Sequence, residues 1–274
     1  MKLFEGILLV TDMDGTFLDD EKKISKKDIQ SIKYFEENGG IFTIATGRIV
    51  ESARPYIEEI GINFPVATYC GSKIFDYREN KVIKEYFLSR ERKEVINKII
   101  EDELPVGLEV YVNEEIYMIK LNEFSDRGAI KPCTKIFDIP DNLMEMEWSK
   151  VLLSGQPEFI DKLEKDFLNY GVGAATRTGK IFLEILPLGT SKLNGIRTMM
   201  KEEGIEDYKL VAVGDDMNDL EMIQGADIGV VMANANKNLL KEAETIESSR
   251  MGTTNDNNPL TYVIEGLQKD LVHN

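Results

Sequence analysis

Several residue types that mark particular classes of protein are scarce in this sequence. Its 274 residues include two cysteines, one tryptophan and one histidine. Cys70 and Cys133 lack CxxC spacing and the N-terminus has no signal-type segment, so we expect a reducing, cytoplasmic setting and no chemistry at the thiols. The single histidine, His273, lies next to the last residue, and we expect no catalytic role for it.

Positive charge is also in short supply. The chain has 33 lysines and arginines against 49 aspartates and glutamates, which gives a formal net charge of −16. Nucleic acids and anionic membrane surfaces bind basic faces, so we expect neither as a partner. No apolar run approaches the ~20 residues of a membrane-spanning helix. An anionic ligand would therefore have to be held by a few local groups.

The most informative stretch lies near the N-terminus, where an aliphatic run ends in two acids. Residues 7–10 read Ile-Leu-Leu-Val, the pattern of a strand buried on both faces of a parallel sheet. Asp12 and Asp14 follow, with Gly15 directly after them. Ligands of open α/β sheets bind beyond the carboxyl ends of the strands, so this position suits a reaction centre. A strand followed by an ordinary Asp-Gly turn would give the same local pattern.

The next segments alternate between helix and strand. Ser25 can cap a helix that Gly39-Gly40 closes, residues 41–45 read as a second buried strand, and a helical stretch runs to Ile60. Residues 66–69 make a third strand. This β-α-β-α-β order predicts an α/β fold with a doubly wound, Rossmann-like parallel sheet.

The alternation stops near Asn80 and resumes after Pro187-Leu188-Gly189. We therefore predict a core formed by residues 1–81 and 188–274, with an inserted α+β cap domain at 82–187. The expected elements of the insertion are a helix capped by Ser89, a hairpin of 108–112 with 115–119, a strand at 151–153, a helix at 157–168, and a hairpin of 172–176 with 181–186.

Polar residues follow the later strands of the core as well. Residues 210–214 form a buried strand that ends in Asp215-Asp216-Met217-Asn218-Asp219, and Asn234 follows the strand at 228–232. Lys192 lies in the first turn of a helix, where the helix dipole disfavours a cation, so we expect an anion beside it. A closing helix begins at Asn258-Pro259.

In a doubly wound sheet these strand ends meet at one crevice. Oxygen ligands without histidine or cysteine favour Mg²⁺, which takes one or two carboxylates and substrate phosphate oxygens. With the Thr46 hydroxyl, the Gly47 backbone and Lys192 directed at an anion, one carboxylate can act as a nucleophile and a second as an acid and base. The pattern thus predicts phosphoryl transfer.

Four motifs in order resemble those of the haloacid dehalogenase superfamily, and within it the Cof-like branch (subfamily IIB). They are Asp12-Met13-Asp14-Gly15-Thr16-Phe17-Leu18, Ala45-Thr46-Gly47-Arg48, Lys192, and Gly214-Asp215-Asp216-Met217-Asn218-Asp219. The resemblance implies that Asp12 is the nucleophile and that Asp14 is the general acid and base. It also implies metal ligation by Asp12, Asp14 (through its carbonyl), Asp215 and Asp219, and phosphate binding by Thr46, Gly47, Arg48, Lys192 and Asn218. An alternative role for Asp219 is to orient Lys192 or metal-bound water.

The chain departs from this family at Cys70-Gly71-Ser72, Ala233 and Asp256-Asn257-Asn258, so contacts to the leaving group transfer less well than the core chemistry. We predict a Mg²⁺-dependent phosphatase that hydrolyses a small phosphate monoester, such as a sugar phosphate or similar metabolite, through an aspartyl-phosphate. The alternatives are a phosphomutase of the same superfamily and a receiver-like phosphoacceptor domain. The sequence leaves the substrate and the oligomeric state open.

Overall fold

The computed structural model describes residues 2–102, 104–125 and 133–273. Contacts among them divide the chain into two compact units, the first formed by 1–47, 55–83 and 191–274 and the second by 48–54 and 84–190. The breaks after 83 and 190 fall close to the predicted junctions after 81 and 187. Residues 48–54, which the prediction assigned to the core, group with the second unit, so helix α2 (Val50–Ile60) spans one of the breaks.

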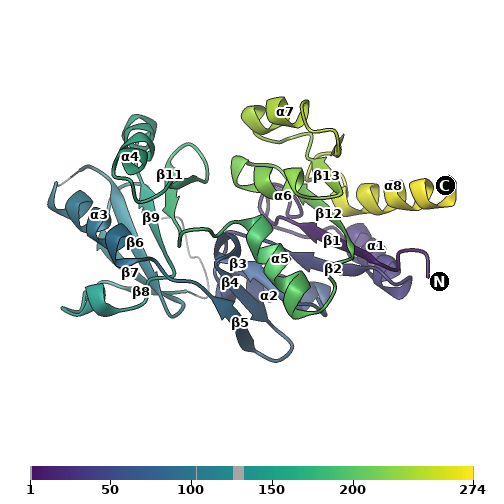
Figure 1. The fold of residues 1–274 in the computed structure, drawn as a ribbon, viewed down its shortest axis with the longest axis horizontal. Coiled ribbons are helices and arrows are strands. Elements are labelled where there is room, and N and C mark those ends of the chain that lie inside the picture. The colour runs from purple at the N-terminus through teal and green to yellow at the C-terminus, as the bar shows by residue number, and fades with distance from the viewer. Residues whose placement is uncertain (1, 103, 126–132, 274) are drawn as a thin grey trace. The chain divides into compact units, whose positions relative to one another are not determined.

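The first unit is built on a five-stranded sheet in which every neighbouring pair is parallel (Figure 1). Its strands, in spatial order, are β14 (Ser249–Met251), β13 (Ile228–Val231), β12 (Lys209–Gly214), β1 (Ile7–Thr11) and β2 (Ile41–Ile44). All residues of β1 are buried, as the unbroken aliphatic run predicts.

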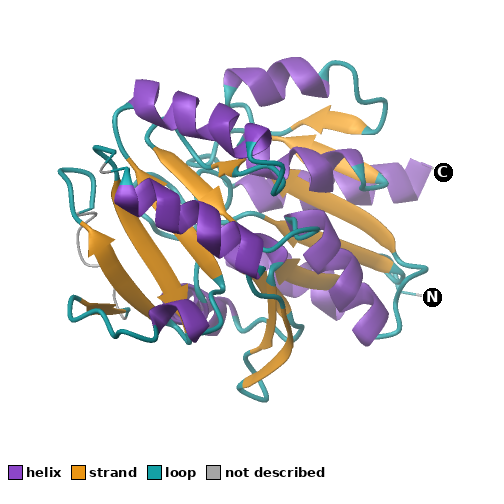
Figure 2. Cartoon of the chain, turned by 60° about the vertical axis from the view of Figure 1, so that its left-hand side comes forward, coloured by secondary structure: helices purple, strands orange, loops and turns teal. Residues whose placement is uncertain are grey.

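Helices cover both faces of this sheet (Figure 2). Helix α1 packs against α8, and α5 packs against α6. The helices are α1 (Lys26–Glu37), α5 (Lys192–Glu202), α6 (Leu220–Gln224), α7 (Lys237–Ala243) and α8 (Pro259–His273). Ser25 caps α1 by accepting hydrogen bonds from the N–H groups of Lys27 and Asp28, as predicted. None of the helices in the described ranges has the length and apolar character needed to cross a membrane.

A small three-stranded sheet comes after helix α2 in the chain, and its first two strands pair antiparallel. It contains β3 (Val66–Thr68), β4 (Lys73–Asp76) and β5 (Lys81–Glu85), and a 3₁₀ turn, η1 (Tyr69–Gly71), joins β3 to β4. The predicted third strand therefore exists, but a single parallel bridge between Ala45 and Ala67 is its link to the end of β2.

The second unit is a two-layer α+β structure. Its sheet has the order β10-β11-β9-β6-β7-β8, and all pairs are antiparallel except β7 with β8. Its elements are α3 (Arg90–Glu101), β6 (Gly107–Val112), β7 (Glu115–Lys120), β8 (Thr134–Ile136), β9 (Lys150–Ser154), α4 (Pro157–Asn169), β10 (Thr176–Arg177) and β11 (Phe182–Ile185). The two units together confirm the predicted fold class, a doubly wound parallel core with an α+β insertion.

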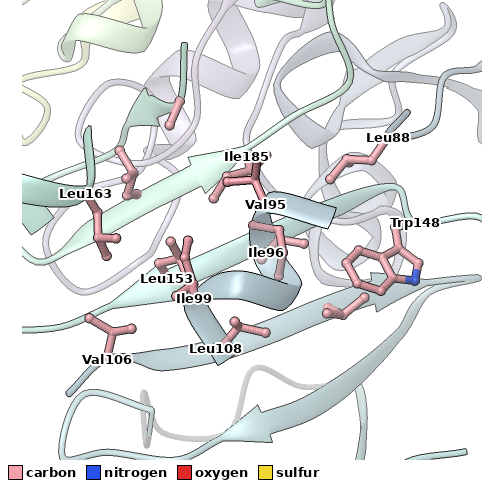
Figure 3. Close-up of a cluster of buried hydrophobic side chains, with 14 of the residues drawn as sticks. Leu88, Val95, Ile96, Ile99, Val106, Leu108, Trp148, Leu153, Leu163 and Ile185 are labelled. Carbon is pink, nitrogen blue, oxygen red and sulfur yellow. The ribbon is translucent and has the colours of Figure 1, made fainter. Parts of the chain in front are cut away.

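The core of the second unit lies between its sheet and its helices (Figure 3). Val95, Ile96 and Ile99 of α3 face Leu108 and Leu153 of the sheet in this cluster. The only tryptophan, Trp148, is 1% exposed and donates its indole N–H to the Leu143 carbonyl at 2.8 Å. It is therefore a core residue.

One predicted strand was wrong. Residues 172–175 are not a strand, and β10 begins only at Thr176. The cause is a long-range contact: Arg92 of α3 donates hydrogen bonds to the carbonyls of Val172 and Ala174, and Gly173 between them has a φ of +86°. A residue with this φ cannot continue an extended strand, and the guanidinium holds the backbone on both sides of it, so the hairpin loses most of its first strand.

Candidate active site

The site starts from two neighbouring parallel strands that end side by side. Thr11, the last residue of β1, pairs with Val213 in β12. The backbone N–H of Asp12 donates to the Val213 carbonyl at 2.9 Å, so the ladder continues one residue past the end of β1. Asp215 directly follows β12. The strand pairing thus brings Asp12 and Asp215 together although about two hundred residues separate them in the chain.

Lys192 supplies the cation of the site. It is the first residue of α5, which Ser191 caps, and it is only 1% exposed. Its Nζ lies 2.7 Å from Oδ1 of Asp12 and 2.6 Å from Oδ1 of Asp219. These two carboxylates are the anions expected from the position of a lysine at a helix N-terminus.

Both oxygens of Asp219 are occupied. Oδ1 contacts Lys192, and Oδ2 accepts the backbone N–H groups of Asp215 at 3.0 Å and Asp216 at 3.1 Å. The side chain is fully buried, and a Cβ at Gly214 would come 2.5 Å from its Cβ, which explains the glycine at the end of β12. Asp219 therefore holds Lys192 and shapes the loop that presents Asp215.

The loop after β1 fits closely around Asp215. The Thr16 hydroxyl donates to Oδ1 of Asp215 at 2.7 Å. Gly15 has a φ of +82°, and a Cβ there would lie 2.3 Å from Oδ2 of the same carboxylate. Only glycine satisfies both conditions. Asp14 differs from the other acids of the site, because its carboxylate is 40% exposed and forms an ion pair with Lys22 at 2.9 Å.

Burial of so many charges shifts the pKa values of the site. Burial, with Asp219 and Asp215 nearby, raises the pKa of Asp12 against the opposing effect of Lys192. Burial and the neighbouring Asp219 raise the pKa of Asp215 to about 7. Burial alone would lower the pKa of Lys192, but Asp12 and Asp219 outweigh it and raise that pKa. The carboxylates thus have more negative charge than one lysine balances, and a second cation would relieve it.

The donor atoms suit a hard cation. One carboxylate oxygen each from Asp12, Asp215 and Asp219 lies within 4.8 Å of the others, and no nitrogen or sulfur ligand belongs to the group. Oδ1 of Asn218 is buried nearby in the chain and has no hydrogen-bond partner among the described residues. Such an all-oxygen set matches Mg²⁺, which takes one or two protein carboxylates.

The second predicted motif follows β2. Thr46 is fully buried, and its N–H donates to the Ala67 carbonyl at 2.8 Å. The carbonyl of Thr46 accepts a hydrogen bond from the N–H of Cys70. The sulfur of Cys70 lies close to Gly47, since a Cβ added at Gly47 would be 3.2 Å from it. Arg48 belongs to the segment that groups with the second unit, and its guanidinium donates to the Ser52 carbonyl at 3.2 Å. The predicted roles of Thr46, Gly47, Arg48 and Asn218 in phosphate binding stay predictions.

Sequence reasoning missed a loop that seats Lys192. Tyr69, Cys70 and Gly71 all have positive φ, at 51°, 52° and 88°. A Cβ at Gly71 would come 2.0 Å from the Ser191 carbonyl oxygen, and one at Gly195 would come 2.7 Å from the Gly71 Cα. Two glycines therefore let this loop press against the first turn of α5. The available signal was a glycine soon after a buried strand, which marks a close backbone approach.

Two asparagines hold the motif loop from outside. Asn234, expected at the crevice, donates its side-chain N–H to the Gly15 carbonyl at 2.7 Å. Asn255, which the sequence did not single out, donates to the Leu18 carbonyl at 3.1 Å and to Oδ1 of Asp20 at 3.2 Å. Both side chains therefore brace the loop that contains Asp12 and Asp14.

Comparison with known proteins agrees with this geometry. A family model described as haloacid dehalogenase-like hydrolase matches residues 9–264. The chain is 27% identical to 5-amino-6-(5-phospho-D-ribitylamino)uracil phosphatase YwtE of Bacillus subtilis (strain 168), over 94% of this chain and 97% of that protein. It is 27% identical to the HMP-PP phosphatase of Serratia proteamaculans (strain 568), over 87% and 89%. The solved structure of a HAD/COF-like hydrolase from Plasmodium vivax superposes with a TM-score of 0.78 at 21% identity, covering 97% of each chain.

The chain belongs to the haloacid dehalogenase-like hydrolases, since the family model spans nearly all of it. The family resemblance inferred from the four motifs is thereby confirmed. The assignment to the Cof-like branch stays a prediction, and the solved HAD/COF-like structure agrees with it in fold. The predicted enzyme class, a phosphatase of this family, is confirmed as well.

Proposed function

We propose that this phosphatase hydrolyses a small phosphate monoester in a Mg²⁺-dependent reaction and that Asp12 is its nucleophile. One observation carries the proposal: Lys192 is buried between Asp12 and Asp219, beside the loop of Asp215. A carboxylate beside a buried ammonium at a strand end is held in place, and the ammonium opposes the rise in pKa that burial causes and so favours the charged form that a nucleophile needs.

In the first step a carboxylate oxygen of Asp12 attacks the phosphorus of the substrate. The bond between phosphorus and the leaving-group oxygen breaks, and that oxygen takes a proton from the carboxyl group of Asp14. The products are an aspartyl-phosphate and a free alcohol. Lys192 supports this step because its ammonium offsets the negative charge that gathers at Asp12 and the phosphoryl oxygens.

In the second step water hydrolyses the aspartyl-phosphate. The carboxylate of Asp14 takes a proton from the water molecule, whose oxygen attacks phosphorus. The bond between phosphorus and Asp12 breaks, which releases orthophosphate and restores the Asp12 carboxylate. Asp14 ends the cycle protonated, so the two steps balance.

We assign the metal to Asp12 and Asp215, with the backbone carbonyl of Asp14 as a further ligand by family resemblance. Asp219, also predicted as a ligand, has both oxygens engaged by Lys192 and two backbone N–H groups, so we assign it the orientation of Lys192 instead. When bound, Mg²⁺ would neutralise charge on the phosphoryl oxygens and the carboxylates.

The substrate class is a small phosphorylated metabolite. The relatives support this, because one is a phosphatase of 5-amino-6-(5-phospho-D-ribitylamino)uracil and another of HMP-PP. We further propose that the second unit, inserted between residues 83 and 191, selects the leaving group, while the first unit performs phosphoryl transfer.

A screen of phosphorylated metabolites tests the function. We expect catalytic release of orthophosphate from at least one monoester with Mg²⁺, and none in chelator. Full activity in chelator would contradict the metal assignment. Transfer of the phosphoryl group to a second position of the same metabolite would indicate the phosphomutase, and phosphorylation without turnover would indicate the phosphoacceptor domain.

A further inference from the structure

The two acids of the first motif have different lysines. Asp12 contacts Lys192, whose side chain is 1% exposed, whereas Asp14 contacts Lys22, whose side chain is 52% exposed. The two aspartates are two residues apart in the chain, and carboxylates so close repel each other unless cations separate them. Each of the two therefore has a separate counter-ion, one within the buried cluster and one outside it.

Lys22 does not pair with the acids nearest to it in sequence. Asp19, Asp20 and Glu21 directly precede it, yet its ammonium lies 2.9 Å from Oδ1 of Asp14, eight positions away. The adjacent lysine, Lys23, pairs with Glu21 instead. The geometry of the turn, and not the nearest acids in sequence, therefore determines which carboxylate Lys22 contacts.

The turn that contains Lys22 has a defined backbone. The N–H of Lys22 donates to the Asp19 carbonyl at 2.9 Å, and the N–H of Asp19 donates to the Lys23 carbonyl at 3.1 Å. Lys22 has a φ of +60°, which few residues other than glycine adopt, and this conformation sets the direction of its side chain.

The turn is also tied to the motif loop. Leu18, which precedes it, forms a β-bridge with Asp14, and the side chain of Asn255 donates to the Leu18 carbonyl and to Asp20. An exposed ion pair alone contributes little to stability, about 0–1 kcal/mol. The ion pair between Lys22 and Asp14 joins two backbone segments that are each held by other hydrogen bonds, so it can still determine where the Asp14 carboxylate lies.

We propose that Lys22 is a positioning residue that holds the Asp14 carboxylate apart from Asp12 and orients it toward the leaving group. The inference rests on the proposed function, because it assigns Lys22 to the proton transfers of Asp14. Lys22 contributes to the first step, in which Asp14 gives its proton to the leaving-group oxygen. It also contributes to the second step, in which Asp14 takes a proton from water.

The test compares two substrates that differ in their need for an acid. An alkyl phosphate monoester has a poor leaving group that must be protonated, whereas p-nitrophenyl phosphate has a good one that departs without a proton. We would measure the rate of leaving-group release in a single turnover with Mg²⁺, for the wild type and for Lys22→Met. We expect the rate to fall roughly 10-fold with the alkyl ester, part of the 10²–10⁴-fold typical of acid catalysis, and less than about twofold with the aryl ester.

Lys23→Met is the matched control, because it removes the adjacent exposed lysine, which pairs with Glu21 and not with Asp14. It should leave both rates unchanged. Lys22→Arg should restore most of the rate with the alkyl ester. Lys22→Asn removes the ammonium but tolerates the left-handed backbone, so it should behave as Lys22→Met even if methionine disturbs the turn.

Equal losses with both esters in Lys22→Met and Lys22→Asn, or no loss with either, would overturn the role of Lys22 and leave the phosphatase mechanism intact. If the wild type released no orthophosphate from any monoester, the proposed function itself would fail, and the role of Lys22 with it. The two failures are thus distinguishable.

Discussion

In the first unit a buried lysine lies beyond the ends of parallel strands, whereas in the second unit a buried lysine lies within an antiparallel sheet. Lys192 contacts Asp12 and Asp219, which come from two loops. Lys150 of β9 contacts Glu184 of β11 at 2.8 Å and lies over the ring of Tyr111 at 4.8 Å. All these charged side chains are buried to a similar degree.

The difference lies in strand direction. Parallel strands send all their carboxyl ends to one edge of the sheet, so the loops after β1 and β12 converge there and their acids accumulate. Antiparallel neighbours such as β6 and β7 are joined by a tight turn at Asn113-Glu114, and their ends alternate between the two edges. A buried ion pair therefore does not mark a reaction centre by itself, whereas convergence of strand ends does.

The largest expected effect comes from the nucleophile. Asp12→Asn should lower phosphatase activity by more than about 10⁴-fold, as loss of a nucleophile typically does, and should abolish any phosphoenzyme. Mass spectrometry of the protein quenched during turnover would locate the phosphoryl group. A phosphorylated residue other than Asp12 would contradict the assignment.

Removing each buried lysine compares the two units directly. Lys192→Met and Lys150→Met should each cost about 3–5 kcal/mol of unfolding free energy, because each leaves a buried carboxylate without its cation. Urea denaturation would measure both. Hydrolysis of p-nitrophenyl phosphate should be lost only in Lys192→Met. Its loss in a folded Lys150→Met variant would show that the comparison is wrong.

Protons and Mg²⁺ should compete at the first unit. The pKa of Asp215 is raised to about 7 in the folded protein, so its contribution to stability is present below the unfolded pKa of 3.8 and is lost as the pH rises toward 7. The metal-free protein should therefore lose stability over this range. Saturating Mg²⁺ should restore about 2–3 kcal/mol, measured as a thermal shift that is larger near about pH 8 than near about pH 5.5.

Asp215→Asn is the control for this experiment, since it removes the titrating carboxylate and one proposed ligand. Its thermal midpoint should respond little to Mg²⁺. A Mg²⁺ shift of equal size at both pH values in the wild type would contradict the link between Asp215 and the metal.

The smallest expected effect is structural and lies in the second unit. Trp148→Phe removes the donor to the buried Leu143 carbonyl and should cost about 1–3 kcal/mol of unfolding free energy. Phosphate release from p-nitrophenyl phosphate should keep its dependence on Mg²⁺. A Trp148→Phe variant that is as stable as the wild type in urea would show that the hydrogen bond contributes nothing net.

Much of this protein could be predicted from local sequence. Ser25 and Ser89 cap the helices they were expected to cap, and the hairpin turns at Asn113-Glu114. The acids at 12 and 215 follow the strands they were expected to follow. These features depend on neighbours within a few positions, because caps, turns and strand patterns act over one turn or one pleat.

Other features were decided by the tertiary structure. Arg92 reaches residues 80 and 82 positions away and prevents the strand expected at 172–175. Gly71 and Gly195 permit a contact that seats Lys192, and Asn255 braces a loop 237 positions before it. Lys22 passes over three adjacent acids to reach Asp14. In each case the fold decides the contact, because it brings together backbone segments that local sequence patterns do not relate to each other. The residue types near each position therefore do not predict its partner.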